Sequence, residues 1–276
     1  MRRRLIWLVI VAAAIVPAFG ATVQVNLASA SAYGLLGGTI SNTGTSVVHG
    51  NVGVGSASGT ITGFYPTGTI VGGSVIAPGS SSSNNAYTDF VNALNAAQLL
   101  SSTATFGDLS TSTTFLGNNV YTTSSTSIST TTGINLTFDA QSNPNAVFVI
   151  RIAQAFTENG AMTFTLANGA QAANIFWIIG TNATISVGSS GPITFDGSIL
   201  AGQAFTMSAA EGGSGTLAGT INGCLFAETA DTLAGTTNVN GCVPAASATP
   251  EPVSAGLVSI GLLLGILAWR KYRVSV

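Results

Sequence analysis

The nonapeptide SILAGQAFT, residues Ser198–Thr206, decides the fold, because three other segments of the chain align with it. Each of the four has an apolar residue at its second position and a threonine at its ninth. The aligned segments are Val149–Thr157, Phe176–Thr184, Ser198–Thr206 and Cys224–Thr232, and a weaker copy ends at Ser129. Self-similarity of this kind, with a somewhat irregular period, indicates a repeat architecture.

The residues around these copies favour short strands. Apolar runs such as Val147–Ile152 and Ile175–Ile179 are separated by Gly, Asn and Ser, which is typical of an all-β chain. The period of the repeat, roughly 22–28 residues, fits one coil of a β-solenoid whose loops vary in length. Because stacked strands lie about 4.8 Å apart, equivalent threonines would form a ladder on one face.

One segment has the pattern of a helix instead. Residues 81–84 offer N-cap side chains, and an apolar stripe at helical spacing follows them. The stripe consists of Tyr87, Phe90, Val91, Leu94 and Ala97. We predict a helix over about residues 84–100 that packs along the sheet. Since solenoid ends must be covered against edge pairing, the candidate covers are this helix, the N-terminal segment and the Cys224–Cys242 region.

Charge is scarce and is concentrated at the two ends of the chain. Charged residues make up 6% of the 276 residues. Between residues 21 and 249 the chain has one base, Arg151, and eight acids, a formal charge of −7. Binding to nucleic acid requires clustered Lys and Arg that neutralise phosphate. The sequence therefore excludes a nucleic-acid partner.

Side chains that could perform catalysis are also scarce. The single histidine, His49, lies in a Gly-rich turn and is interpreted as an exposed loop residue rather than a general base. Asp139 and Asp196 are interpreted as turn caps, and Glu158 as a solvated side chain. The Gly-rich segment at residues 212–215 lacks the Lys of a phosphate-binding loop. We predict no enzymatic activity, no cofactor and no metal.

The two cysteines, Cys224 and Cys242, both lie near the end of the polar region of the chain. In an exported protein such a pair indicates a disulfide. The alternative is two buried thiols.

The N-terminal residues have the pattern of an export signal. Three arginines, Arg2 to Arg4, precede an apolar run over Leu5–Val16 and a small-residue stretch that ends at Ala21. This order predicts a signal peptide over residues 1–20, cleaved after Gly20. The alternative is an uncleaved anchor helix.

The C-terminal residues have the pattern of a membrane anchor. A linker over residues 244–252 ends in Pro250-Glu251-Pro252, and an apolar stretch over residues 253–269 follows. A stretch of this length can just cross a bilayer as a helix. The basic tail, residues 270–276, should stay cytoplasmic, so the bulk of the chain would lie outside the cell.

This three-part end resembles the PEP-CTERM sorting signal of Gram-negative bacteria. The resemblance implies processing by an exosortase-type membrane protease and release or anchoring at the cell surface. The alternative is a plain single-pass anchor. In both cases the protein is expected to be exported.

Further segments, in order along the chain, resemble the microbial ice-binding protein family. They are Tyr33–Gly44, Gly50–Val54, Ile61–Phe64, Phe138–Gln141, Asn143–Phe148, Asn168–Gln171 and Asn174–Trp177. The resemblance implies a right-handed, triangular, discontinuous β-helix over residues 21–243, with one long helix alongside. The family cysteine expected before the Asn-Ile-Phe-Trp run is Ala173 here, so any disulfide at that site is absent.

The same resemblance implies the residues that would bind ice. Some members carry Thr-Ala/Gly-x-Thr/Asn on the ice-binding face. Thr229–Thr232 fits this motif and Thr181–Thr184 nearly does, whereas two copies begin with Gln. The implied site is Gln154, Thr157, Thr181, Thr184, Gln203, Thr206, Thr229 and Thr232.

Threonine suits a surface that orders water. Its methyl group must be caged by water, its hydroxyl can anchor the cage, and its χ1 angle is stiff. The predicted function is therefore adsorption to ice and its ordered water. Because Thr is also a good strand residue on exposed faces, the alternative is a structural or adhesive cell-surface or matrix protein on the same fold. Phe156 and Phe205, at equivalent positions, are expected in a core column rather than in a ligand platform.

Overall fold

The structure is a computed structural model that describes residues 23–130, 133–159, 162–186, 193–208 and 217–242. The predicted signal peptide, the Pro-Glu-Pro linker, the apolar stretch at 253–269 and the basic tail lie outside these residues. In the described part, no helix is both long enough and apolar enough to cross a membrane.

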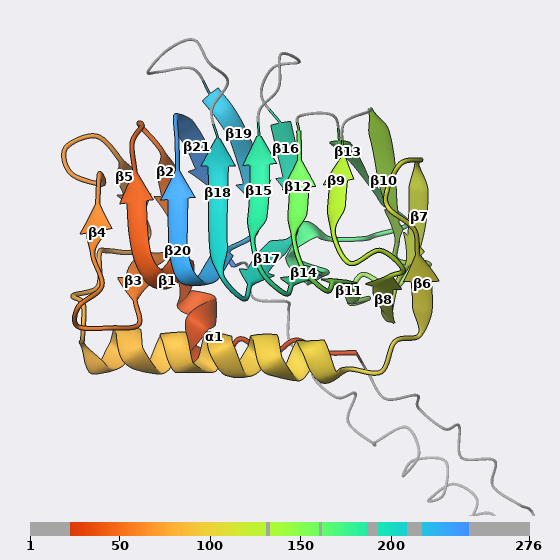
Figure 1. Ribbon diagram of the computed structural model, residues 1–276, viewed down its shortest axis with the longest axis horizontal. Coiled ribbons are helices and arrows are strands. Elements are labelled where there is room, and N and C mark those ends of the chain that lie inside the picture. Colours follow the sequence, from red (N-terminus) through yellow and green to blue (C-terminus); the bar gives the residue numbers. More distant parts are fainter. Residues whose placement is uncertain (1–22, 131–132, 160–161, 187–192, 209–216, 243–276) are drawn as a thin grey trace, which may run out of the picture.

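The described chain winds into stacked coils, and the strands of each coil pair in parallel with those of its neighbours (Figure 1). The coils have three sides, which we call the helix face, the open face and the split face. Strands β1 and β20 are long enough to continue from the helix face into the open face. The parallel all-β solenoid predicted from the repeats is thereby confirmed.

The helix face is the side against which the helix packs. Its strands are β6 (Ala104–Phe106), β8 (Asn119–Thr123), β11 (Phe148–Ile152), β14 (Ile175–Ile179), β17 (Ser198–Ala201) and β3 (Asn51–Val54), together with the first parts of β20 (Leu225–Leu233) and β1 (Tyr33–Asn42).

The open face is covered by no helix in the described part of the chain, and its strands face the viewer in Figure 1. They are β9 (Ile128–Thr130), β12 (Phe156–Glu158), β15 (Ala183–Ser186), β18 (Ala204–Ser208) and β4 (Ile61–Thr62), together with the second parts of β20 and β1.

The split face consists of two separate parallel sheets. Their strands are β7 (Thr113–Leu116), β10 (Ile134–Asp139) and β13 (Met162–Ala167) in one, and β16 (Ile193–Asp196), β19 (Leu217–Asn222), β21 (Thr236–Val239), β2 (Val47–His49) and β5 (Thr69–Val71) in the other.

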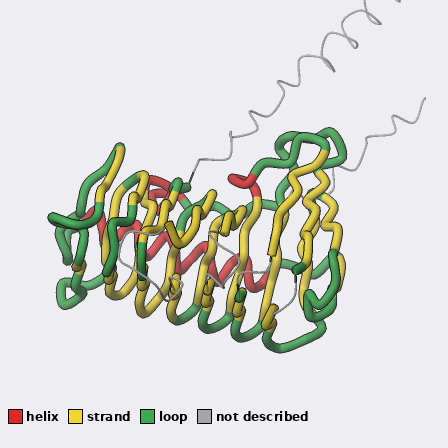
Figure 2. Tube along the Cα trace, turned by 90° about the horizontal axis from the view of Figure 1, so that it is seen from above, coloured by secondary structure: helices red, strands yellow, loops and turns green. Residues whose placement is uncertain are grey.

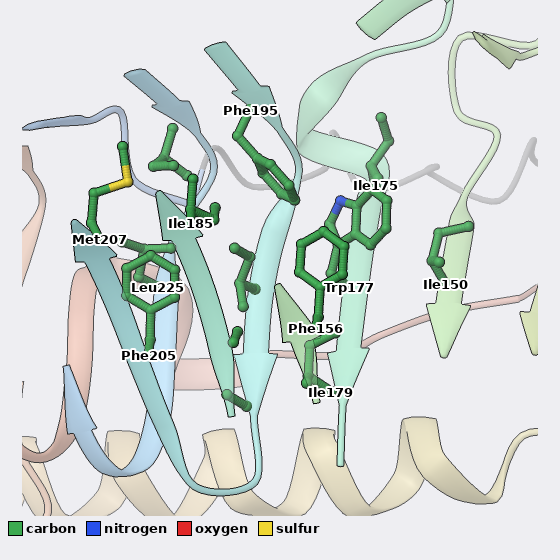
Figure 3. Packing of buried hydrophobic residues seen from close by; sticks show 14 of the residues in the cluster. Ile150, Phe156, Ile175, Trp177, Ile179, Ile185, Phe195, Phe205, Met207 and Leu225 are labelled. Carbon is green, nitrogen blue, oxygen red and sulfur yellow. The ribbon is translucent and has the colours of Figure 1, made fainter. Parts of the chain in front are cut away.

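The core lies between the three faces and is built from stacked inward side chains (Figure 3). The second residue of each repeat forms one such column, in which Ile150, Trp177 and Ile199 are adjacent. Phe156 and Phe205 are both fully buried, so their predicted place in the core is confirmed. Ala183 stands between them in register, which leaves room for two large rings in one column.

The order of coils in space differs from the order in sequence. Strand β1 pairs with β20 along one edge and with β3 and β4 along the other. The first coil is therefore inserted between the last coil and the second. In consequence the Cys224–Cys242 region lies inside the stack, and the expectation that it covers an end is wrong. The two terminal coils instead bury Leu109 and Phe64, each from a loop beside them.

Helix α1 spans Ser81–Leu99 and runs along the helix face, so it is not an end cover either (Figure 2). It begins slightly earlier than predicted, because the Ser80 hydroxyl accepts a hydrogen bond from the Ser83 N–H at 3.3 Å. Its buried side chains include Phe90 and Leu94. The Phe90 ring lies 5.4 Å from that of Phe226, an outward residue of the helix face. A second apolar layer thus joins helix and solenoid.

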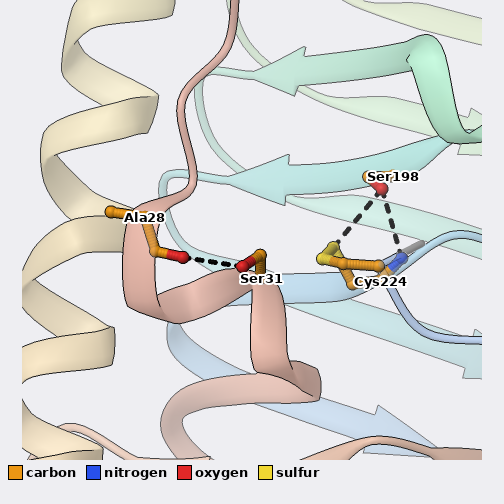
Figure 4. Close-up of a disulfide and its surroundings, with 5 residues drawn as sticks. Ala28, Ser31, Ser198 and Cys224 are labelled. Carbon is orange, nitrogen blue, oxygen red and sulfur yellow. Dashed lines mark hydrogen bonds between the residues drawn. A yellow bond between two sulfur atoms is a disulfide. The ribbon is translucent and has the colours of Figure 1, made fainter. Parts of the chain in front are cut away.

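The structure pairs Cys224 with Cys242, whose Cα atoms are 4.6 Å apart (Figure 4). The Ser198 hydroxyl accepts a hydrogen bond from the Cys224 N–H at 3.2 Å and lies 3.3 Å from the Cys224 sulfur. The cysteines therefore occupy the same corner on adjacent coils.

Candidate functional site

The open face carries one continuous column of hydroxyl side chains. Strand register places Thr157, Thr184 and Thr206 side by side, and the column extends in both directions. In spatial order it consists of Ser129, Thr157, Thr184, Thr206, Thr232, Ser41 and Thr62. We call these seven residues the ladder.

The ladder side chains point outward because their neighbours along each strand point inward. Ile185 and Met207, next to Thr184 and Thr206, are fully buried. In the part of the chain that the structure describes, the ladder hydroxyls make no hydrogen bond to protein except that of Thr62, at 3.5 Å from the Ile40 carbonyl oxygen. The remaining six hydroxyls are available to water.

A second column runs parallel to the ladder, two residues earlier on each strand. Ala204 pairs with Ala230, and Ala230 pairs with Thr39. The full column is Ser127, Ala155, Asn182, Ala204, Ala230, Thr39 and Thr60. The centre of the open face therefore sets the ladder hydroxyls beside alanine methyl groups and the Asn182 amide, and both ends of the face have hydroxyls in both columns.

The other four residues predicted for the site lie at the corner where the helix face turns into the open face. Backbone hydrogen bonds join these residues from coil to coil. The Thr181 N–H donates to the Gln154 carbonyl oxygen at 3.1 Å, the Gln203 N–H to the Thr181 carbonyl oxygen at 3.0 Å, and the Thr229 N–H to the Gln203 carbonyl oxygen at 2.8 Å. All eight predicted residues therefore fall into two parallel columns on or beside one face.

Among the described residues, the ladder and the column beside it contain no ionisable side chain, and Glu228 of β20 is partly exposed at the corner beside Thr229. Glu158 and Asp231, which belong to β12 and β20, point into the core and are 1% and 0% exposed. The expectation that Glu158 is solvated is wrong: its Oε1 accepts a hydrogen bond from the Met162 N–H at 2.8 Å. Strand alternation is the reason, because Glu158 follows an outward threonine. Burial raises the pKa of the Asp231 carboxyl well above its ordinary value.

The split face also carries threonines, and the hydroxyls of three of them are bound to Asn135. Thr163 and Thr165 donate to the Asn135 Oδ1 atom at 3.3 and 3.1 Å. The Asn135 amide in turn donates to the Thr137 hydroxyl at 3.4 Å. The face contains the carboxylate of Asp139 and is interrupted between its two sheets. The open face is thus the better candidate for an ordered, uncharged array.

The residues considered for catalysis have structural surroundings. Asp139 accepts hydrogen bonds from the Gln141 N–H and the Asn168 side chain, both at 2.8 Å, which lowers its pKa. Asp196 accepts from the Asn222 side chain at 2.7 Å. His49 is exposed at the end of β2. Among the described residues, no three His, Cys, Asp or Glu side chains lie close enough together to hold a metal ion.

Two ladder residues, Ser41 and Thr62, were missed by reasoning on the repeat. The repeat copies follow one another along the chain, whereas the coils of β1 and β4 are stacked out of sequence order. A usable signal was present in the tripeptides Thr39–Ser41 and Thr60–Thr62. Both have the outward–inward–outward alternation of the Ala-Phe-Thr ending of the repeat.

Comparison with known proteins gives one consistent result. The model of a family described as "Ice-binding-like" matches residues 35–240. A protein of Nostoc sp. (strain HG1) named "Ice-binding protein" is 35% identical over 182 residues, which are 66% of this chain and 63% of that protein. The aligned region is therefore less than two thirds of that relative.

Solved structures of similar fold point the same way. An ice-binding protein from the Antarctic ascomycete Antarctomyces psychrotrophicus is 28% identical, with a TM-score of 0.64, covering 79% of this chain and 98% of its own. An ice-binding protein from an Antarctic biological consortium is 26% identical, with a TM-score of 0.66, covering 79% and 92%.

Proposed function

The chain belongs to the ice-binding-like family, and from this premise we propose that it adsorbs to ice through its open face. The observation that carries the proposal is the seven-residue ladder, with six hydroxyls that are unused within the described protein and no ionisable side chain in the ladder or in the column beside it. The site residues are then the eight predicted ones together with Ser129, Ser41 and Thr62.

The physical basis is the ordering of water on a rigid, repetitive surface. Neighbouring strands are about 4.8 Å apart, and outward residues two apart on one strand are about 6.7 Å apart. The two columns therefore make a regular grid. Methyl groups on Thr and Ala favour a water cage, and the hydroxyls hold it by hydrogen bonds. Since β-branched side chains have one strongly restricted χ1, little entropy is lost on binding.

The test is to place charge on the open face and to compare it with equal charge elsewhere. The full-length chain, kept in mild detergent, is assayed for thermal hysteresis and inhibition of ice recrystallisation. We expect Thr184→Lys, Thr206→Lys and Thr232→Lys together to remove most of both activities. A long, strongly hydrated ammonium disrupts an ordered water layer.

The matched control carries three lysines on the split face, at Thr114, Thr165 and Thr194, all exposed. It has the same charge change and should retain activity. Loss of activity in the control but not in the first variant would assign ice binding to the split face. If the unaltered chain neither shapes ice nor slows recrystallisation, the proposal fails, and a structural or adhesive role on the same fold is left.

We further propose that the protein is exported and held at, or released from, the surface of a Gram-negative bacterium. Support comes from the sequence: the signal-peptide pattern of residues 1–20, and Pro250-Glu251-Pro252 followed by an apolar stretch and a basic tail. The partners would be the membrane and an exosortase-type protease. The finer fold features that the resemblance implies, right-handed winding and a triangular section, belong to the same proposal.

Processing can be measured directly. Mass spectrometry of the surface-exposed protein should find an N-terminus at Ala21. Replacing Pro250 and Pro252 with alanine should retain the chain in its unprocessed form. An unchanged mass and location in that variant would favour a plain single-pass anchor.

We infer that the protein works without catalysis. Adsorption to ice breaks no covalent bond, and Asp139 and Asp196 are engaged in turns rather than aimed at a shared point.

A further inference from the structure

The corner between the split face and the helix face is a stacked, Gly-centred turn. Three adjacent coils contribute Asp196–Ser198, Asn222–Cys224 and Asn240–Cys242. The Asn222 side chain donates to the Asp196 Oδ1 at 2.7 Å, and the Asn240 side chain donates to the Asn222 Oδ1 at 2.7 Å. An amide ladder thus holds this corner in register.

The glycines of this corner are required for close stacking. A Cβ on Gly223 would lie 2.3 Å from the Gly197 carbonyl oxygen, and one on Gly241 would lie 2.4 Å from that of His49. The turns of this edge are therefore stacked too closely to admit a side chain at these glycines. Since each coil passes from the helix face to the open face and then to the split face, this edge is the one that the open face does not touch.

Both ends of the described chain lie on this side of the molecule. Cys242 is bonded to Cys224 and packs, together with Val23, against the apolar layer between α1 and the helix face. Cys242, the last described residue, therefore lies at the edge opposite the ladder.

The disulfide also determines which strand bears a force applied at Cys242. Without it, tension at Cys242 would fall on the four residues of β21. With it, tension passes to Cys224, at the start of β20, which pairs with β17, β18 and β1. The exit point is thereby joined to the most extensively paired strand of the open and helix faces.

We propose that the protein attaches a surface to ice: held by its C-terminal residues, it presents the open face outward to an ice crystal. The proposal rests on the proposed function of the open face and on anchoring through the residues after 242. Its partner is solid ice, and the fixed geometry of the Cys224–Cys242 edge keeps the ladder away from the anchoring surface. A freely diffusing inhibitor would need no such orientation.

The experiment compares two points of attachment of the full-length chain. In one preparation a biotin-acceptor peptide follows Val276. In the other, Thr184→Cys is biotinylated at its new thiol, in the middle of the ladder. Each is bound at equal density to fluorescent streptavidin beads, and the fraction of beads retained on growing polycrystalline ice is counted after washing. Both proteins are first assayed uncoupled for ice shaping.

We expect beads held at the C-terminus to be retained at least several-fold more than beads held at Thr184. C-terminally held beads that carry T184K, T206K and T232K should wash off. If uncoupled protein shapes ice but C-terminally held beads are not retained, or if both attachments retain beads equally, the inference is overturned while the proposed function stands. If the uncoupled protein with the acceptor peptide after Val276, whose ladder is unaltered, does not shape ice, the proposed function itself fails.

Discussion

Asp231 shows how a single residue of the Thr-Ala-Asp-Thr motif is placed by strand alternation. Its neighbours Ala230 and Thr232 point out of the open face, so its carboxyl points into the core between Phe205 and Ile40. It is fully buried, and neither carboxylate oxygen has a hydrogen-bond partner among the described residues. An ionised carboxylate is strongly disfavoured there, so the pKa is raised.

This burial predicts that the protein is less stable at high pH. The folded state keeps a proton on Asp231 that the unfolded chain loses above its ordinary pKa. The free energy of unfolding therefore falls with rising pH, by at most about 1.4 kcal/mol per unit for one proton. Asp231→Asn should remove this slope and be the more stable form at neutral pH. Chemical denaturation from pH 4 to pH 9 measures it.

Glu228→Gln is the matched control for this pH dependence. Glu228 lies on the same strand and burial raises its pKa as well, but its side chain is only partly buried. Most of the slope should therefore persist in that variant. An identical slope in wild type and Asp231→Asn would show that Asp231 is ionised in the folded protein.

Arg151, the only base between the two ends of the chain, joins helix to solenoid. Its guanidinium donates to the carbonyl oxygens of Gln98 and Leu100, at the end of α1, and to the Thr122 hydroxyl. The final carbonyls of a helix have no partner within it, and a cation there is favoured by the helix dipole.

Arg151→Met keeps the aliphatic stem and removes these donors. We expect a loss of about 1–3 kcal/mol in the free energy of unfolding, with faster amide exchange in the last turn of α1. Asn92→Ala, on the exposed side of the helix, should change stability by less than about 0.5 kcal/mol. Equal stability of the two variants would contradict a docking role for Arg151.

At the scale of elements, the disulfide closes the last coil. Its cysteines have a sequence separation of 18, and a loop of about this length is stabilised by roughly 3 kcal/mol when cross-linked. Replacing both cysteines by alanine should lower stability by that order and should increase amide exchange in β21. Exchange in the distant strand β9 should be unaffected, which serves as the internal control. No difference between oxidised and reduced wild-type protein would refute this.

Which elements could be foreseen depended on whether their signal was local. The helix was predictable because an N-cap and an apolar stripe are contiguous in sequence, and the ladder from β12 to β20 because its coils follow one another. The buried Asp231 was also within reach, since it aligns with Phe156 and Phe205 in the repeat. The insertion of β1 beside β20 was not, because it depends on packing between segments at opposite ends of the described sequence.

At the scale of the whole molecule, the three faces differ in how much of their surface is uncovered and in whether their threonine hydroxyls are bound to protein. The helix face is covered by α1, and the split face is interrupted, with the hydroxyls of Thr163 and Thr165 bound to Asn135. Only the open face, among the described residues, combines continuity across the coils with unused hydroxyls. The same division leaves both ends of the described chain on the side away from the ladder, as the proposed attachment through the residues after 242 requires.

The insertion of β1 leads to a prediction about the whole face. Ser41 lies in register with Thr232 and Thr62, although Ser41 belongs to the first coil of the sequence and Thr232 to the last. If the ladder acts as one surface, Ser41→Lys should reduce thermal hysteresis about as much as Thr206→Lys. Thr114→Lys, on the split face, should leave it unchanged.

Circular dichroism melting of the three variants checks that each remains folded, since all three positions are at the surface. A variant at Ser41 that keeps full activity while the variant at Thr206 loses it would restrict the binding surface to the consecutive coils from β12 to β20. Equal losses would instead require that ice contacts both sides of the boundary between β20 and β1. The inserted coil would then be part of the binding surface, because a crystal plane meets the strands in their spatial order.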